Sequence, residues 1–236
     1  MDRTIGLDEI DELLRANGVS AWGVASNDPP MALAPILPRA ISLMVSYQAA
    51  ALVGMDREPT AAYFADYQRL NATLNAAAAV LVRHLRRAGH RASGVEATLE
   101  DYEQVQDWGA AGVFAHKTAA TRAGLGWIGK TALFVSPVLG PKVRLATVFT
   151  DLDLPPGTPV DTGRCGRCRR CVDACPVGAG RDVQWQAGMA RDLLYDEKAC
   201  ESYTDLFPEL AGVCGVCVAA CPFGRRALSH LAALTP

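Results

Sequence analysis

The sequence predicts a mixed α/β fold with two unequal domains, the second of them small and rich in cysteine. Half of the 236 residues are apolar, which is enough for one large core and a satellite domain. The first 150 residues combine a long helical pattern with apolar, β-branched segments, whereas all eight cysteines lie after residue 160. We therefore expect an α/β domain over residues 1–158 and a cysteine-rich domain over residues 159–236.

The first domain is expected to be a sheet with helices on both faces. Residues Leu7–Asn17 have helical spacing and precede Gly18, a frequent helix terminator, while Ser20–Ser26 has strand character. The segment Arg39–Tyr47 is apolar and β-branched without alternation, as is typical of a strand covered on both faces. This strand indicates a sheet sandwiched by helices.

The longest helix is predicted from Thr60 to Gly89. Its apolar residues recur at intervals of three and four along one face: Phe64, Tyr67, Leu70, Leu74, Ala78, Leu81 and Leu85. A second helix is predicted over Val113–Arg122, and strands over Thr131–Ser136 and Val143–Thr150. Residues 155–163, rich in proline and glycine, form the predicted linker between the domains.

The composition argues against several classes of function. The formal net charge is −2, the sequence pI is about 6.1, and no long run of like charge occurs, so we expect no nucleic-acid partner and no membrane surface. The N-terminus lacks the pattern of a secretory signal, and the apolar window Ala40–Met55 is too short to span a bilayer. We expect a cytoplasmic protein, whose cysteines then serve metal ligation rather than disulfides.

The cysteines form two motifs, each closed by a proline. The first is Cys165, Cys168, Cys171 and Cys175 with Pro176, and the second is Cys200, Cys214, Cys217 and Cys221 with Pro222. The spacing is typical of two-cluster ferredoxins, in which the fourth cysteine of a motif ligates the other cluster. We expect set 1 (Cys165, Cys168, Cys171 and Cys221) to hold [4Fe–4S] cluster 1, and set 2 (Cys200, Cys214, Cys217 and Cys175) to hold cluster 2. Two Cys₄ zinc sites are the alternative, although a zinc site needs neither a third cysteine at the same short spacing nor a proline after the fourth.

A glycine-rich segment, Gly124–Thr131, matches both the P-loop and the dinucleotide patterns. Both patterns need a strand before the loop and a helix after it. The predicted order here is the reverse, so we expect no nucleotide site. Two interpretations stay open: close approach to a flat ligand that Trp127 and Lys130 contact, or a helix end and tight turn with a core tryptophan.

Other candidate residues are sparse. The four histidines, His84, His90, His116 and His230, form no closely spaced metal-binding pair. Arginines crowd the first cysteine motif and fit either a solvated surface or a docking site for an acidic electron donor: Arg164, Arg167, Arg169 and Arg170.

The segments RAISLMVSY, FADYQRL, RAGLGWIGKTALFVSP and FTDLDL, together with the eight cysteines, resemble the epoxyqueuosine reductase family, which is related to the reductive dehalogenases. The resemblance runs from about residue 7 to residue 226. It implies a cobalamin on a nitroreductase-like α/β domain beside a ferredoxin-like domain, with electrons passing from the clusters to cobalt. It also implies cofactor contacts from Gly126, Trp127, Gly129 and Lys130.

Two departures separate the sequence from that family. The sequence ends 14 residues after Pro222, so we expect it to lack the helical-repeat extension that long members use to recognise tRNA. The family's proposed proton donor is an aspartate thirteen residues before the AGLGW segment, a position that Ala110 occupies here. The nearest carboxylate, Asp107, is a weak candidate for the acid.

The combined expectation is a reductase that passes electrons through two [4Fe–4S] clusters to a corrinoid and does not reduce epoxyqueuosine in tRNA. The alternatives are an electron carrier or corrinoid-activating protein without substrate chemistry of its own, and a reductase with a flavin in the cobalamin position. The expected partners are a ferredoxin or flavodoxin as electron donor and a small-molecule or corrinoid substrate.

Overall fold

The computed structural model describes residues 5–31, 36–98 and 114–224, and its chain divides into two compact units. Unit 1 comprises Met1–Val45, Arg69–Leu125 and Arg144–Val160, and unit 2 comprises Ser46–Gln68, Gly126–Val143 and Asp161–Pro236. The last change of unit falls between Val160 and Asp161, inside the predicted linker. The division of the sequence into domains at residue 158 stays a prediction.

Unit 1 contains a four-stranded sheet in the order β1-β2-β6-β3. Its strands are β1 (Ala21–Ser26), β2 (Arg39–Ser46), β3 (Ala92–Val95) and β6 (Val143–Thr150). Strand β1 pairs antiparallel with β2, and β3 pairs antiparallel with β6. The bounds predicted for β6 are confirmed to the residue, whereas the short strand β3 was not predicted.

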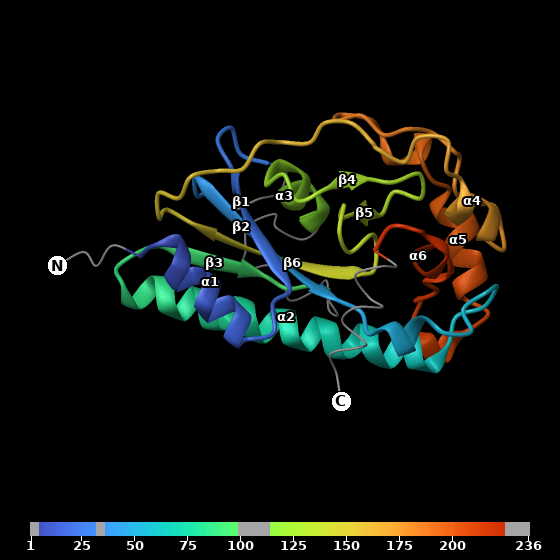
Figure 1. The fold of residues 1–236 in the computed structure, drawn as a ribbon, viewed down its shortest axis with the longest axis horizontal. Coiled ribbons are helices and arrows are strands. Elements are labelled where there is room, and N and C mark those ends of the chain that lie inside the picture. The colour runs from blue at the N-terminus through green and yellow to red at the C-terminus, as the bar shows by residue number, and fades with distance from the viewer. Residues whose placement is uncertain (1–4, 32–35, 99–113, 225–236) are drawn as a thin grey trace. The chain divides into compact units, whose positions relative to one another are not determined.

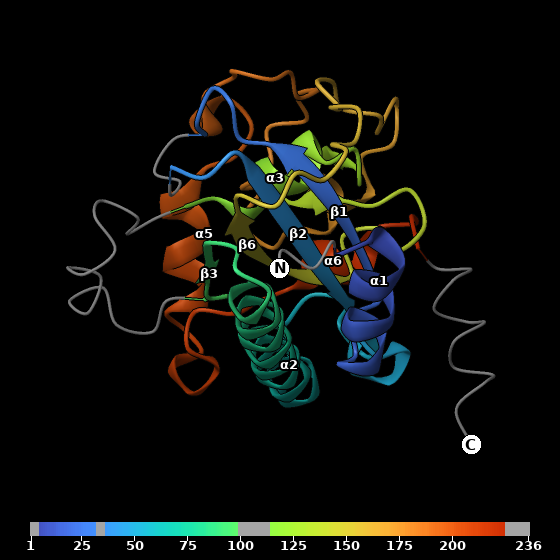
Figure 2. The same cartoon turned by 90° about the vertical axis from the view of Figure 1, so that its left-hand side faces the viewer.

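Helices cover both faces of this sheet, as the apolar segment around β2 predicts. Figures 1 and 2 show α1 (Leu7–Ala16) and α2 (Ala61–Arg87) on one face and α3 (His116–Arg122) on the other. Six consecutive residues of β2 are buried, in agreement with a strand enclosed on both sides. The mixed α/β class is thereby confirmed.

All three of these helices end at a glycine in the left-handed conformation: Gly18, Gly89 and Gly124, with φ of 80°, 95° and 78°. After α3, the N–H of Gly124 donates to Thr121 O at 3.1 Å and that of Leu125 to Ala120 O at 3.0 Å. This pair of bonds is a Schellman motif, which satisfies carbonyls left free at a helix end. The glycine-rich segment thus begins as a helix terminator.

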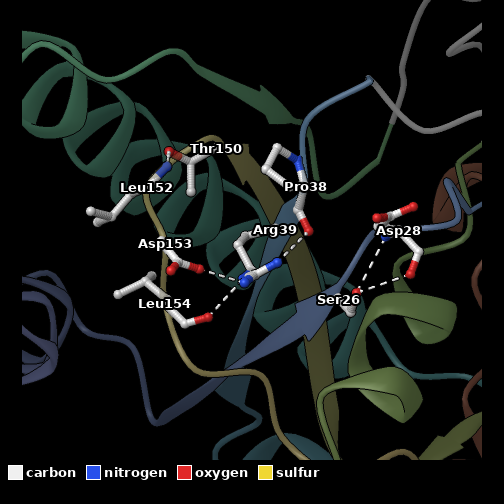
Figure 3. Close-up of polar contacts among 8 residues, drawn as sticks. All are labelled: Ser26, Asp28, Pro38, Arg39, Thr150, Leu152, Asp153 and Leu154. Atoms are coloured by element: carbon white, nitrogen blue, oxygen red, sulfur yellow. Dashed lines mark hydrogen bonds and ion pairs between the residues drawn. The ribbon is translucent and has the colours of Figure 1, made fainter.

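Arg39, at the start of β2, fixes the segment that follows β6 (Figure 3). Its Nε donates to Leu154 O at 2.7 Å, and its Nη2 pairs with the Asp153 carboxylate. The N–H of Leu152 donates to the Thr150 hydroxyl at 3.1 Å. These contacts hold residues 152–154 in place between strand β6 and the predicted linker.

The buried face of α2 changes along the helix. Its later part follows the prediction, with these residues fully or almost fully buried: Leu70, Leu74, Ala78, Leu81 and Leu85. In the first two turns Tyr63 and Asp66 are buried instead of Phe64 and Tyr67, so that part of the prediction is wrong. These turns belong to unit 2, where the ring of Tyr63 stacks on Tyr47 with centroids 4.7 Å apart.

Unit 2 consists of a small hairpin and short helices. The hairpin joins β4 (Trp127–Ile128) to β5 (Phe134–Val135), and the helices are α4 (Arg170–Ala174), α5 (Glu197–Thr204) and α6 (Val216–Ala220). Only two residues of the predicted strand Thr131–Ser136 form β5, because Ala132 adopts φ of 56° and its N–H bonds to Gly129 O in a turn. Helices α4 and α6 pack against one another.

Within the described ranges, no helix combines the length and the apolar character needed to cross a lipid bilayer.

Candidate functional site

The eight cysteines lie in unit 2, and all of them are free thiols. Cys221 is buried and the other seven are half-buried. Cys171 lies in α4 and Cys217 at the equivalent place in α6, so the two packed helices carry the third cysteine of each motif. Thiol sulfur is the ligand that iron–sulfur clusters use.

The thiols of set 1 influence one another across the two motifs. Burial, together with the nearby thiols of Cys221, Cys165 and Cys168, raises the pKa of Cys171 to about 11. Burial also raises the pKa of Cys221, to which Cys165 and Cys168 contribute. The last cysteine of the second motif therefore lies among the first three of the first motif, as the crossed pattern requires.

The thiols of set 2 show the reciprocal arrangement. Burial raises the pKa of Cys214, and Cys200 and Cys175 add to it. Burial likewise raises the pKa of Cys217, with contributions from the other three members of the set and from Cys171. Among the described residues, no group of three or more Cys, His, Asp or Glu side chains has the arrangement of a metal-ion site. The ligand assignment stays a prediction, supported by this grouping.

Three hydrogen-bond donors reach the sulfurs of set 1. The indole Nε1 of Trp127 donates to Cys165 Sγ at 3.4 Å. The Thr131 hydroxyl donates to the Cys171 sulfur, and the backbone N–H of Phe223 donates to that of Cys221. Two of these donors are side chains of the segment that forms the β4–β5 hairpin.

A buried lysine lies beside the same set. Lys142 is 2% exposed, and its Nζ donates to Cys221 O and Phe223 O at 2.7 Å each. Its charge lowers the pKa of Cys221, against the larger effect of burial. The sequence analysis missed Lys142 because its partners lie 79 and 81 residues away and no local pattern marks it.

Backbone groups and a tyrosine provide the donors to set 2. The N–H of Ala179 donates to Cys175 Sγ at 3.3 Å, and the backbone N–H of Val216 donates to Cys214. The hydroxyl of Tyr195 donates to Cys200, and burial together with this contact raises the pKa of Tyr195. The guanidinium of Arg191 lies 5.4 Å from the centre of the Tyr195 ring.

The four predicted cofactor contacts, Gly126, Trp127, Gly129 and Lys130, are all buried. Trp127 packs edge-on against Phe223, with ring centroids 5.2 Å apart, and Lys130 Nζ lies 2.6 Å from Asp182 Oδ1. A Cβ added to Gly126 would meet Val135 O at 2.1 Å. These positions are thus occupied by contacts with the protein itself, and their role as corrin contacts stays a prediction.

The context of the glycine-rich segment is the one that the sequence predicted. It leads from helix α3 into strand β4, whereas a phosphate-binding loop leads from a strand into a helix. This order agrees with the predicted one, and the expectation of no nucleotide site stays a prediction. Trp127, at 2% exposed, is a core tryptophan, in agreement with the second of the two interpretations left open.

The remaining candidates do not gather at the cysteines. Asp107, Ala110 and His230 lie outside the described residues. His84 pairs with Glu9 at 2.9 Å and His90 with Asp151 at 3.5 Å, both in unit 1. His116 is half-buried in unit 1, and its desolvation lowers its pKa to about 4. Of the arginines near the first motif, Arg169 pairs with Asp173 at 2.8 Å.

Residues 164–225 match the 4Fe-4S dicluster domain, a family model. This match covers every cysteine and confirms the predicted class of the C-terminal segment.

Curated relatives carry two kinds of names. A tetrachloroethene reductive dehalogenase of Sulfurospirillum multivorans is 37% identical over 118 residues, which is 45% of this chain and 23% of the relative. An epoxyqueuosine reductase of Lactococcus garvieae is 34% identical over 149 residues, which is 59% of this chain and 40% of the relative. The matched part is therefore less than half of either relative.

Solved structures of the same two kinds share the fold. A catabolic reductive dehalogenase in complex with 3-bromo-4-hydroxybenzoic acid aligns with a TM-score of 0.71 at 20% identity, over 96% of this chain and 33% of that one. The epoxyqueuosine reductase of Bacillus subtilis aligns with a TM-score of 0.60 at 18% identity, over 92% of this chain and 65% of that one.

Proposed function

Because this chain belongs to an epoxyqueuosine reductase-like family related to the reductive dehalogenases, we propose that it is a reductase that passes electrons through two [4Fe–4S] clusters to a corrinoid. Set 1 holds cluster 1, and set 2 holds cluster 2. The observation that carries this proposal is the mutual grouping of the thiols across the two motifs. The α/β domain of residues 1–158 holds the corrinoid on a nitroreductase-like architecture.

The residues present fit the clusters. Eight free thiols supply two complete ligand sets, and N–H groups of Trp127 and Ala179 point at ligand sulfurs. Such N–H donors accompany cluster ligands and influence their potentials. When bound, the clusters supply one-electron redox chemistry, while the chain's own residues fix the thiolates and limit their contact with water.

The fit to a corrinoid is supported by likeness alone. The structure of a structurally similar reductive dehalogenase is described as suggesting a mechanism for B12-dependent dehalogenation. In this chain the side chains of Trp127 and Lys130 already contact protein partners, so we assign no side-chain contact to the corrin and derive no step through it. The competing proposals are a flavin in its place, or an electron carrier without substrate chemistry.

Anaerobically purified protein tests the cofactors. We expect about eight irons per chain and a broad absorption at about 400 nm that bleaches on reduction. Stoichiometric zinc with little iron would contradict the cluster assignment. Titration with cobalamin in both redox states should change the spectrum, and absence of any spectral or calorimetric change would favour the electron carrier. A flavin spectrum before any addition would favour the flavin reductase.

We further propose that the substrate is a small molecule or a corrinoid and not epoxyqueuosine in tRNA, and that an acidic carrier such as a ferredoxin or flavodoxin supplies the electrons. The resemblance places the family's proton donor at Ala110, and alanine has no proton to donate. Loss of a general acid costs a factor of about 10² to 10⁴ in rate. We propose a cytoplasmic location.

Epoxyqueuosine reduction is the rival activity, since curated relatives bear that name and one structurally similar reductase is described with an epoxyqueuosine-modified tRNA stem loop. The test is the queuosine content of tRNA in cells that lack their own epoxyqueuosine reductase and express this chain. We expect no queuosine. Restored queuosine would overturn the proposal, and its loss in Asp107→Ala would identify the acid.

A further inference from the structure

The side chains of one segment of unit 2, from Trp127 to Lys142, contact members of set 1 from both cysteine motifs. Trp127 contacts Cys165 and Thr131 contacts Cys171, both in the first motif, and Lys142 contacts the backbone at Cys221 in the second. A single stretch of chain that contains none of the ligands therefore contacts members of set 1 from both motifs.

The Trp127 indole is held in one position. The side chain is 2% exposed, and its ring meets Phe223 at an interplanar angle of 81°. The Nε1–H points at Cys165 Sγ at 3.4 Å, within the range of an N–H···S hydrogen bond. Because the ring is enclosed by protein, this donor stays on the sulfur when the charge of the sulfur changes.

Lys142 brings a cation to the other end of the same set. Its ammonium group is enclosed, and it bonds to the carbonyls on both sides of Pro222, directly after the last cysteine. A charge in a medium of low dielectric acts more strongly and over a longer range than one in water. The exposed Arg164, next to Cys165 in the sequence, is screened by solvent.

Both features favour one redox state. Reduction adds an electron, and therefore a negative charge, to a cluster and its thiolates. A donor to a ligand sulfur and an enclosed cation both stabilise the added charge. At set 2 a nearby cation, Arg191, pairs with Glu197, and both side chains are more than half exposed, so its effect is smaller.

We propose that Trp127 and Lys142 are positioning residues that raise the reduction potential of cluster 1 without a comparable effect on cluster 2. This inference rests on the proposed ligand sets. It gives Trp127 a role at the clusters that does not require contact with a corrin.

The test is an EPR-monitored titration with dithionite, in which each cluster takes up one electron, on protein with full iron content. Trp127→Phe keeps an aromatic ring and removes the donor, and Lys142→Met removes the charge at similar length. Lys142→Met should make cluster 1 harder to reduce by about tenfold in its equilibrium constant, which is about 59 mV for a one-electron couple. Trp127→Phe should shift the potential of cluster 1 in the same direction by less, because no formal charge is lost. Lys142→Arg should stay near the wild type, and Arg164→Met should shift cluster 1 less than Lys142→Met does.

The outcomes separate this inference from the proposed function. Wild-type protein without iron would defeat the ligand sets themselves. Full iron with unchanged potentials in both variants, or equal shifts of the two clusters, would overturn the inference alone. If Lys142→Met fails to assemble cluster 1, Trp127→Phe and Lys142→Arg decide: the inference stands only if the first lowers the cluster 1 potential and the second retains it.

Discussion

The two cysteine sets have the same composition and different surroundings. In the proposed assignment each set takes three members from one motif and one from the other, and α4 and α6 pack together as their equivalent helices. Set 1 adjoins an indole, a threonine hydroxyl and a buried lysine, all from residues 127–142. Set 2 adjoins tyrosines: the hydroxyl of Tyr195 donates to Cys200, and the ring of Tyr63 packs on Gly215.

This difference teaches that a repeated ligand motif does not imply two equivalent redox centres. The spacing of the thiols decides which clusters form, while the residues packed around them decide how readily each accepts an electron. In this protein the asymmetry originates mainly outside the motifs, in a segment that precedes them in the sequence. Variants of the ligands, of the motif backbone and of the surrounding donors test this distinction.

The largest effect is expected from single ligand changes. Cys221→Ser should remove cluster 1, and Cys175→Ser should remove cluster 2. The reason is that the thiol of each residue lies among the thiols of the other motif. Iron should fall by about half in both variants, with loss of a different EPR signal in each. If Cys221→Ser instead removes the signal that Cys200→Ser removes, the crossed assignment is wrong.

A smaller, local effect is expected at Gly215, which lies between Cys214 and Cys217. A Cβ added there would meet Tyr63 Cε1 at 2.2 Å, and φ is 77°. Gly215→Ala should therefore displace the second motif and lower the occupancy of cluster 2 while cluster 1 remains. Iron analysis with EPR measures both.

Gly212→Ala is the matched control for Gly215→Ala. Gly212 has nearly the same φ, 75°, with no atom within 4 Å of an added Cβ. Its change should cost only the backbone strain of about 1–2 kcal/mol in unfolding free energy and leave both clusters filled. Equal loss of cluster 2 in the two variants would show that backbone strain, and not the Tyr63 contact, is responsible.

The smallest effects are expected from single neutral donors. Tyr195→Phe removes the hydroxyl that donates to Cys200, and Thr131→Val removes the hydroxyl that donates to Cys171. Each should lower the potential of its own cluster, by less than Lys142→Met does, since no formal charge is lost. A redox titration in which Tyr195→Phe shifts cluster 1 would contradict the division of the surroundings described here.

Local pattern predicted much of this arrangement. The 4Fe-4S class of the cysteine motifs, the bounds of β6 and the glycine at the end of α1 all follow from spacing or from residue type, whereas the crossed ligand sets stay a prediction. The buried face of the later part of α2 was also predicted, because its apolar residues pack against a single sheet. These features are encoded by neighbours in the sequence.

Long-range contacts were not predictable in the same way. Tyr63 and Asp66 are buried because the start of α2 belongs to a different unit from its end, which a helical period cannot show. The family resemblance assigns Trp127 to a corrin contact, which stays a prediction. The contact of Trp127 with Cys165 joins residues 38 positions apart, and the partners of Lys142 are more distant still.

The bonds of Lys142 to Cys221 and Phe223 also close the chain into a ring. The ends of this ring, Lys142 and Cys221, are 79 residues apart along the backbone, and the other seven cysteines lie between them. Joining the ends of a long flexible loop costs entropy that grows slowly with its length. Once the lysine holds the ends together, the last cysteine is already near the first three. The thiols of set 1 are therefore brought together before iron binds.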